Sequence, residues 1–247
     1  MPYDTLTLQH AGVIAEIRLE SEATRSPRCL DEIDRVAAVL HDDASVRVVL
    51  LTAPAGGFAA EPATDTVTRA DPSLLPFHCL ELLRQPVVAC IEGAATGMGL
   101  ELLLACDIRI AAEGATFAIT AIASGLIPAA GATQRLPRLI GKARATEMLL
   151  LGGTIDAATA LSWGLVNDVL PRDGVRARAN ALAQTIAARG PIAVAYAKEA
   201  ILRGLDMPLE QALRYETDLT ILLQTTADRA EGVSAFLKKR TPEFEGH

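Results

Sequence analysis

The sequence predicts an α/β fold whose parallel strands are joined by helices, followed by a region that is almost wholly helical. Three observations support this prediction. Apolar runs of strand length alternate with segments of helical spacing in the first half of the chain. A glycine-rich turn at 93–99 separates a buried strand from a helix. After about residue 130 the pattern becomes helical, and 191–237 shows three helices and no strand signal.

The individual elements follow from the spacing of apolar residues. Strands are expected in a hairpin at 4–19 that turns at Ala11-Gly12, and at 46–52, 86–92 and 107–112. Helices of the first half are expected at 29–41, 74–84 and about 99–106. Residues 53–72 are polar and rich in Ala, Gly and Pro, which predicts a loop. We find no long linker, so we divide the chain into an α/β core, 1–190, and a helical C-terminal region, 191–247.

The composition argues against several classes of protein. Half of the 247 residues are apolar, which is enough for a large core, and the net charge of -7 argues against a broad nucleic-acid surface. No apolar run reaches membrane-spanning length, and the N-terminus shows no secretory signal. Cys90 and Cys106 lie in apolar runs and no CxxC pair occurs, which indicates buried free thiols. We therefore expect a cytoplasmic protein that binds neither nucleic acid nor membrane.

Several common site motifs are missing from the sequence. The four histidines stand apart, with no HExxH motif and no Cys/His cluster, so no metal site is predicted. Ser124 lies in Ala-Ser-Gly and not in GxSxG, which argues against a serine hydrolase. Gly97-Met98-Gly99 is followed by Leu-Glu-Leu, so the third glycine of a dinucleotide-binding fingerprint is missing. We expect no metal or redox cofactor.

Residues 86–107, PVVACIEGAATGMGLELLLACD, contain the best candidate for a site. The predicted strand ends at Glu92, and the chain turns through Gly93 to Gly99 into a helix. Glycines let the backbone approach a ligand closely, and the N–H groups at a helix start suit an anion or a developing oxyanion. Glu101, in the first turn of that helix, is a candidate acid or base. The alternative is that Glu101 only complements the helix dipole.

This segment resembles the oxyanion-hole turn of the crotonase (enoyl-CoA hydratase/isomerase) superfamily, usually written P-V-I-A-x-x-x-G-x-x-x-G-G-G-x-E-L. The similarity continues through blocks at 105–119, 125–153, 155–171 and 235–244, and it covers essentially the whole chain. It implies an α/β, crotonase-like spiral of ββα units with a helical C-terminal trimerisation region. It also implies a homotrimer or homohexamer that acts on an acyl-CoA thioester, with the CoA as part of the substrate and no separate cofactor.

The resemblance assigns roles to residues one by one. Glu101 matches the first catalytic glutamate of the family. Met98 matches a donor of the oxyanion hole, and because the donor is the backbone N–H, the Met side chain does not abolish it. Gly97 is expected to contact the substrate. Lys239, in the cluster that closes the last helix, is expected to contact the phosphates of CoA; the alternative is an ordinary solvated helix end.

Two positions depart from the family pattern. The second family glutamate lies twenty residues after the first, where this chain has Ala121, and alanine cannot transfer a proton. The other oxyanion donor belongs to a loop that corresponds to 58–65 here. A straight count puts Pro62, which has no N–H, at the donor position, whereas a loop two residues longer would put Ala63 there. The substrate-binding residues expected from this part of the chain and from the second glutamate position are Ala60, Pro62, Ala63, Asp65 and Ala121.

Three functions remain open from the sequence. The first is hydration or double-bond isomerisation of an enoyl-CoA, with Glu101 as the acid or base and the Met98 N–H in the oxyanion hole. The second is a diverged reaction that needs one carboxylate or none, such as thioester hydrolysis or decarboxylation of a malonyl-type CoA, suggested by Ala121 and the altered 58–65 loop. The third is a CoA-ester-binding paralogue without turnover, suggested by Ala121 together with the altered 58–65 loop.

Overall fold

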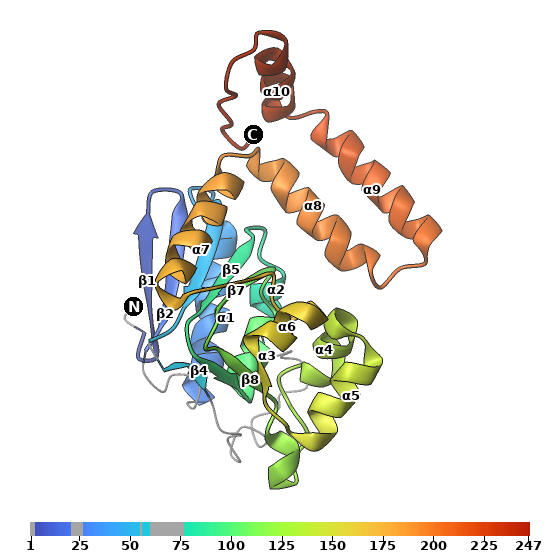
Figure 1. The fold of residues 1–247 in the computed structure, drawn as a ribbon. Helices are drawn as coiled ribbons and strands as arrows, with labels where there is room; N and C mark the ends of the chain where they lie inside the picture. The colour runs from blue at the N-terminus through green and yellow to red at the C-terminus, as the bar shows by residue number, and fades with distance from the viewer. Residues whose placement is uncertain (1–2, 21–26, 55, 60–76) are drawn as a thin grey trace.

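The structure is a computed structural model that describes residues 3–20, 27–54, 56–59 and 77–247 (Figure 1). Two sheets form the core, and the C-terminal helices stand away from them. This arrangement agrees with the α/β core followed by helices that the sequence predicts. In the described residues, we find no helix with the length and apolar character needed to span a bilayer.

The larger sheet has six strands in the order β1-β2-β3-β5-β7-β10. Only the hairpin of β1 and β2 is antiparallel, and the other neighbours are parallel. The strand bounds are β1 Leu6–Ala11, β2 Ile14–Leu19, β3 Val48–Thr52, β5 Val87–Ile91, β7 Ile108–Ala112 and β10 Asp168–Leu170. The predicted hairpin and the three predicted inner strands are confirmed. β10 corrects the expectation of an almost wholly helical second half, because three residues are too few to show a strand period.

Helices cover both faces of this sheet. Alternate strand residues such as Val48 and Leu50 pack against α7 (Arg172–Ala187), whereas Val49 and Leu51 belong to the main core with α1 (Pro27–Asp42). Parallel strands that are buried on both faces require continuous apolar runs. The run VVLLT of β3 meets that requirement, since all five residues are buried.

The smaller sheet positions the candidate site. Its order is β4-β6-β8-β9, with bounds β4 Gly57–Ala59, β6 Ala94–Thr96, β8 Thr116–Ala118 and β9 Ile155–Asp156. The first three strands are parallel, and β9 pairs with β8 antiparallel. The turn expected at 93–99 therefore contains a strand, β6. Ala94–Thr96 lacked a strand signal because three small residues gain their order from pairing with β4 and β8 and not from an apolar run.

Shorter helices complete the core. Their bounds are α2 His78–Glu81, α3 Met98–Leu104, α4 Ala132–Ile140, α5 Lys142–Leu151 and α6 Ala157–Trp163, with a 3-10 helix at Ala121–Ser124. The helix expected at 99–106 is confirmed as α3, with slightly different ends. Of the helix expected at 74–84, residues 77–84 are described, and only His78–Glu81 are helical, so the expectation was too long at its C-terminal end. Cys90 and Cys106 are buried free thiols as predicted, and Cys79 is exposed.

The C-terminal region contains three helices, α8 Pro191–Gly204, α9 Leu209–Leu223 and α10 Ala227–Leu237, as the sequence predicts. Figure 1 shows α8 and α9 as a hairpin that projects from the core, with α10 beyond it. Lys198 of α8 is the link to the sheets: its Nζ lies 2.7 Å from Asp107 Oδ2, and its side chain is only 9% exposed. The same Asp107 oxygen accepts the Val87 N–H at 2.7 Å, so one carboxylate joins α8 to β5.

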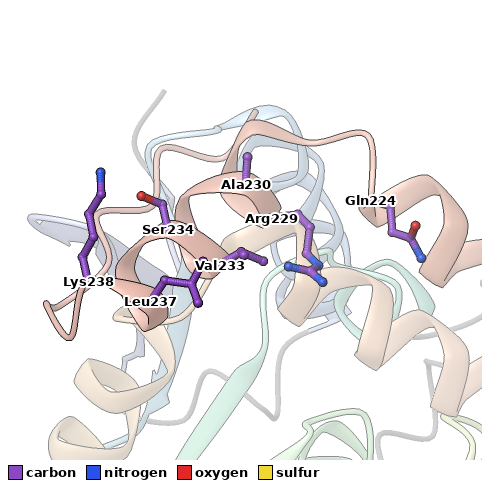
Figure 2. A pocket seen from close by; sticks show the side chains of 7 residues that line it. All are labelled: Gln224, Arg229, Ala230, Val233, Ser234, Leu237 and Lys238. Carbon is purple, nitrogen blue, oxygen red and sulfur yellow. The ribbon is translucent and has the colours of Figure 1, made fainter.

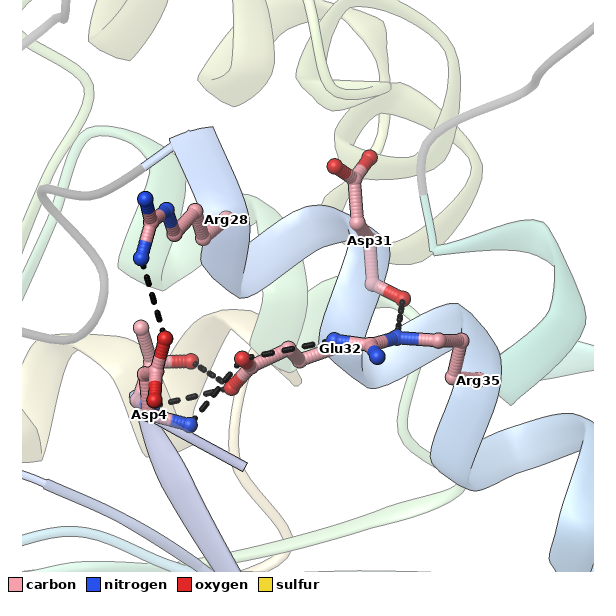
Figure 3. A network of polar contacts seen from close by, with 6 residues as sticks. Asp4, Arg28, Asp31, Glu32 and Arg35 are labelled. Atoms are coloured by element: carbon pink, nitrogen blue, oxygen red, sulfur yellow. Dashed lines mark hydrogen bonds and ion pairs between the residues drawn. The ribbon is translucent and has the colours of Figure 1, made fainter. Parts of the chain in front are cut away.

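A polar network joins α1 to the chain just before β1 (Figure 3). Glu32 is 2% exposed and accepts the N–H groups of Asp4 and Thr5 and the Thr5 hydroxyl. Burial raises the pKa of Glu32, but these hydrogen bonds and the charge of Arg35 outweigh burial and hold the pKa below its usual value. Glu32 therefore stabilises the fold as a carboxylate, and this contribution is lost as the pH falls through the lowered pKa.

Candidate active site

Three parallel strands of the smaller sheet end at one edge, and the candidate site residues follow them. β6 ends at Thr96 and leads directly into Gly97 and Met98. β8 ends at Ala118, opposite Thr96, and leads to Ala121. β4 ends at Ala59, also opposite Thr96, and the chain continues toward 60–65. Because parallel neighbouring strands place their carboxyl ends at the same edge, the fold brings the ends of these three strands together.

The turn before α3 presents the backbone N–H of Met98. Gly97 has φ 52° and ψ -128°, a conformation that side chains disfavour, and its own N–H bonds to the Ala118 carbonyl at 3.0 Å. The helical hydrogen-bond pattern begins at Glu101, whose N–H donates to the Gly97 carbonyl at 3.1 Å. The N–H groups of Met98, Gly99 and Leu100 precede it, at the end of the helix where backbone N–H groups lack intrahelical acceptors. Backbone N–H groups at a helix start are donors of the kind that an oxyanion hole requires.

Gly99 allows α3 to lie directly against β4. A Cβ built on Gly99 would stand 1.6 Å from the Phe58 carbonyl oxygen and 2.6 Å from its carbon. No contact between a real Cβ and a backbone oxygen is that short, so any side chain would push helix and strand apart. Gly99 thus fixes the spacing between the Met98 turn and the end of β4.

We expect Gly99→Ala to destabilise the protein by about 1–3 kcal/mol, because the added methyl overpacks a contact made by rigid backbone on both sides. The variant is also expected to lose activity in the fraction that stays folded, since the Met98 turn moves away from β4. Thermal unfolding at fixed protein concentration measures the first effect and turnover the second. Gly114→Ala is the matched control, since a Cβ there meets nothing within 4 Å. Equal stability of the two variants would contradict the argument.

Glu101 is held in place by a turn from a distant part of the chain. Glu101 is buried, with 5% of its surface exposed. Oε1 accepts the N–H groups of Ala130 and Ala132, both at 2.9 Å. None of the described residues donates to Oε2. One carboxylate oxygen is therefore fixed by two amides, and the other is available to carry a proton.

The environment of Glu101 favours its protonated form more than water does. Burial raises the pKa of the Glu101 carboxyl, and the amides of Ala132 and Ala130 and the charge of Arg135 oppose this only in part. A buried carboxyl with a raised pKa can accept and return a proton closer to neutral pH than an ordinary glutamate. This is the property needed in a general acid or base.

The remaining expected site residues differ in where they lie relative to Glu101. Ala121 is 6% exposed and begins the 3-10 helix that follows β8. Lys239 follows α10, with φ 52°, and Figure 1 shows α10 well away from α3, so one chain does not bring Lys239 to Glu101. The expected substrate contacts at Ala60, Pro62, Ala63 and Asp65 lie outside the described residues.

A groove on α10 is separate from this site. Figure 2 shows its lining, and its volume is about 560 Å³. The lining residues are Gln224, Arg229, Ala230, Val233, Ser234, Leu237 and Lys238. Glu101 and Met98 are not among them. The groove is apolar along the helix and carries two cationic side chains.

Sequence reasoning missed the turn at 130–132 and the side chain that supports it, Arg135. Arg135 Nη1 donates to the Ala130 carbonyl at 3.0 Å, and Nη2 lies 2.8 Å from Glu81 Oε2. The sequence offered a signal in Ala-Ala-Gly-Ala at 129–132, where Gly131 adopts φ 108°. Such a glycine marks a backbone turn, but nothing local says which side chain the turn binds.

Comparisons with known proteins agree with this geometry. The sequence profile described as enoyl-CoA hydratase/isomerase matches residues 10–247. The chain is 35% identical to a probable enoyl-CoA hydratase of Mycobacterium bovis, over 99% of each protein. It is 39% identical to the 2,3-dehydroadipyl-CoA hydratase of Escherichia coli K12, over 83% of each. The solved enoyl-CoA hydratase of Bacillus anthracis superposes with a TM-score of 0.91 at 36% identity, covering 99% of this chain and 100% of that one. The chain therefore belongs to the crotonase superfamily, as a member of the enoyl-CoA hydratase/isomerase family.

Proposed function

We propose that the protein hydrates the double bond of an enoyl-CoA, or moves that double bond, through a stabilised thioester enolate. Glu101 is the general acid and base, and the Met98 N–H is one donor to the thioester oxygen. The curated relatives at 35% and 39% identity have hydratase names, which supports hydration over the diverged reactions. The proposed steps use the chain, the CoA ester and, for hydration, one water molecule.

A single carboxylate can carry out both proton transfers of the hydration. Glu101 Oε2 takes a proton from a water molecule, whose oxygen forms a bond to Cβ of the enoyl group. The electron pair of the double bond moves onto the thioester oxygen, where the Met98 N–H stabilises it. The enolate then collapses, and the proton on Oε2 passes to Cα. One water is consumed, and Glu101 ends as the carboxylate that it was at the start.

One observation carries this proposal most directly: two amides hold Glu101 Oε1, while no described residue donates to Oε2. A family member with two carboxylates can divide the proton transfers between them. With Ala121 at the second position, both transfers are assigned to Oε2. The expected consequence is a hydratase slower than a two-carboxylate enzyme by up to about 10²–10⁴-fold, the usual contribution of one general acid or base.

The test is to add the protein to crotonyl-CoA and follow the loss of the enoyl-thioester absorbance, with chromatographic identification of the product. Formation of 3-hydroxybutyryl-CoA supports the proposal. A 3-enoyl-CoA converted to its 2-enoyl isomer supports the isomerase form. Free CoA from several thioesters, or loss of CO₂ from a malonyl-type CoA, would replace it with the diverged reactions. CoA-ester binding without any turnover would replace it with the non-catalytic alternative.

We also propose that 191–247 is an assembly region through which the chain forms a homotrimer or a homohexamer. α8 has no buried residue in the single chain, and large apolar side chains on α8 to α10 are exposed. Examples are Leu205, Leu209 and Phe236, which are 73%, 75% and 83% exposed. Several large exposed apolar side chains on neighbouring helices indicate contact with protein. Light scattering on the purified protein tests the proposal, and a monomer at micromolar concentration would refute it.

We place the reaction in the cytoplasm. The support is chemical: burial raises the pKa of Cys90 to about 11 and of Cys106 to about 12, so both remain thiols. Such groups suit a reducing compartment. Fractionation of cells that express the tagged protein tests this, and recovery outside the cytoplasm would refute it.

A further inference from the structure

The turn at 130–132 decides where the Glu101 carboxylate lies, because both hydrogen bonds to Oε1 come from it. The turn itself contains only small residues, Ala130, Gly131 and Ala132, of which Ala130 and Ala132 are buried. It has no large side chain of its own to fix its position. Its placement must therefore come from neighbouring groups.

Arg135 supplies that support from the first turn of α4. Its Nη1 donates to the Ala130 carbonyl at 3.0 Å, and its backbone N–H bonds to the Gly131 carbonyl at 2.8 Å. A Cβ built on Gly131 would stand 2.2 Å from Nη1, so the guanidinium lies directly against the backbone of the turn. Arg135 therefore forms hydrogen bonds to the 130–132 turn through both its side chain and its backbone, and that turn forms hydrogen bonds to Glu101.

Glu81 of α2 holds the guanidinium in this orientation. Its Oε2 lies 2.8 Å from Nη2 and 3.3 Å from Nε of Arg135, and the two side chains are only 25% and 15% exposed. His78 contacts the same oxygen through Nδ1 at 3.3 Å. A planar guanidinium that bonds a carboxylate on one side and a carbonyl on the other has little freedom to move.

We propose that Arg135, anchored by Glu81, is a positioning residue that sets the place and the charge of the Glu101 carboxylate through the 130–132 turn. It acts on the reaction through Glu101 and does not itself contact the substrate. The inference rests on the proposed function for its kinetic consequences. Its effect on the ionisation of Glu101 can be measured without turnover.

The charge of Arg135 affects a measurable property, the pKa of Glu101. Burial raises the pKa of Glu101, and the positive charge of Arg135 counteracts part of that rise. Removing the charge should raise the pKa of Glu101 further. A base must be ionised to accept a proton, so the acidic limb of the kcat/KM profile should move to higher pH. A residue that only stabilised the fold would not move this limb.

The test compares Arg135→Met with Arg138→Met, a loss of the same charge one turn later on α4. Arg138 is 58% exposed, and its ion pair with Asp206 is 3.5 Å long. In Arg135→Met we expect kcat to fall by about 10²-fold, the cost of a carboxylate displaced by about 1 Å, with a smaller change in KM. Arg138→Met should behave as wild type. All profiles are recorded in a His78→Gln background, which removes the imidazole in contact with Glu81.

Arg135→Lys separates charge from geometry. Lysine keeps the positive charge but cannot bond Glu81 and the Ala130 carbonyl in one plane. We expect its acidic limb to return toward that of wild type while kcat recovers only in part. An acidic limb that is the same in Arg135→Met as in wild type would overturn the proposal. So would an equal displacement of the limb in Arg138→Met.

Infrared titration measures the protonation of the Glu101 carboxyl without turnover. The C=O band of the protonated Glu101 carboxyl is identified as the band that Glu101→Gln removes, and its midpoint is compared between variants. If wild type does not turn over crotonyl-CoA, the proposed function fails, and this midpoint still decides the role of Arg135. If Arg135→Met does not fold, Arg135→Gln replaces it, since glutamine also removes the charge but keeps an N–H donor; an unchanged midpoint there overturns the inference.

Discussion

Glu101→Gln is expected to lower kcat by about 10²–10⁴-fold, equivalent to about 3–5 kcal/mol of barrier. The amide oxygen of glutamine can still accept the N–H groups of Ala130 and Ala132, so the fold should be kept. The amide cannot carry a proton at the position of Oε2. Because burial raises the pKa of Glu101, wild-type kcat/KM should fall as the pH drops through this raised value, and the variant should lack that acidic limb. Crotonyl-CoA hydration between acidic and neutral pH measures both effects.

Glu92→Gln is the matched control for this variant. Glu92 follows β5 in the same stretch of sequence, but its Oε2 faces Arg172 at 3.8 Å, and its side chain is 27% exposed. Removing one surface-type ion pair should change the free energy of unfolding by about 1 kcal/mol or less and leave kcat within about twofold. Equal activity of Glu101→Gln and wild type would refute the role of Glu101. Equal losses in both variants would mean that the effect is not specific to the site.

The second large effect is expected at Arg109, where Arg109→Met should lower the free energy of unfolding by about 3 kcal/mol or more. Arg109 of β7 is 4% exposed, and its guanidinium donates to three carbonyls. These are Leu165 at 2.7 Å, Leu103 at 3.3 Å and Cys106. Two of them lie at the C-terminal end of α3, so Arg109 also orients the helix that carries Glu101. Methionine fills similar space but leaves the buried carbonyls without donors.

Denaturation of Arg109→Met and of Arg178→Met at one protein concentration tests this prediction. Arg178 is 45% exposed, and its ion pair with Asp168, 2.9 Å long, is at the surface. Its loss should cost about 1 kcal/mol or less. If both variants unfold at the same midpoint, the buried guanidinium does not contribute as argued. A stable Arg109→Met with low kcat would instead mean that α3 has shifted without unfolding.

Much of the fold could be predicted because its signals are local. In the run VVLLT the four residues before Thr52 are apolar, and all five are buried in the strand that they form. The spacing of Ile33, Val36, Ala37 and Leu40 predicts a helix, and all four are buried in α1. By contrast, β6 and β9 could not be predicted. Strands of two or three residues have no period to detect, and they exist because neighbouring strands satisfy their backbone hydrogen bonds.

The candidate site likewise contains residues that the sequence could identify and residues that only the structure reveals. Gly97, Met98 and Glu101 lie within five consecutive residues, so the sequence alone shows that they are neighbours in one strand–turn–helix segment. The amides that hold Glu101 come from 29 and 31 residues further along the sequence. The Arg135–Glu81 pair joins residues 54 apart. Alanine amides carry no chemical label in a sequence, so only the folded chain reveals them as ligands of a carboxylate.

The sequence by itself therefore determined the longer strands and helices, the family and the presence of a carboxyl group in the first turn of a helix. Each of these depends on local pattern or on a run of linked motifs. Only the tertiary structure decided how that carboxyl group is held, which of its oxygens can carry a proton, and which cation modulates its pKa. Those properties depend on burial and on contacts between segments far apart in the chain, because desolvation and hydrogen bonding act through space and not along the sequence.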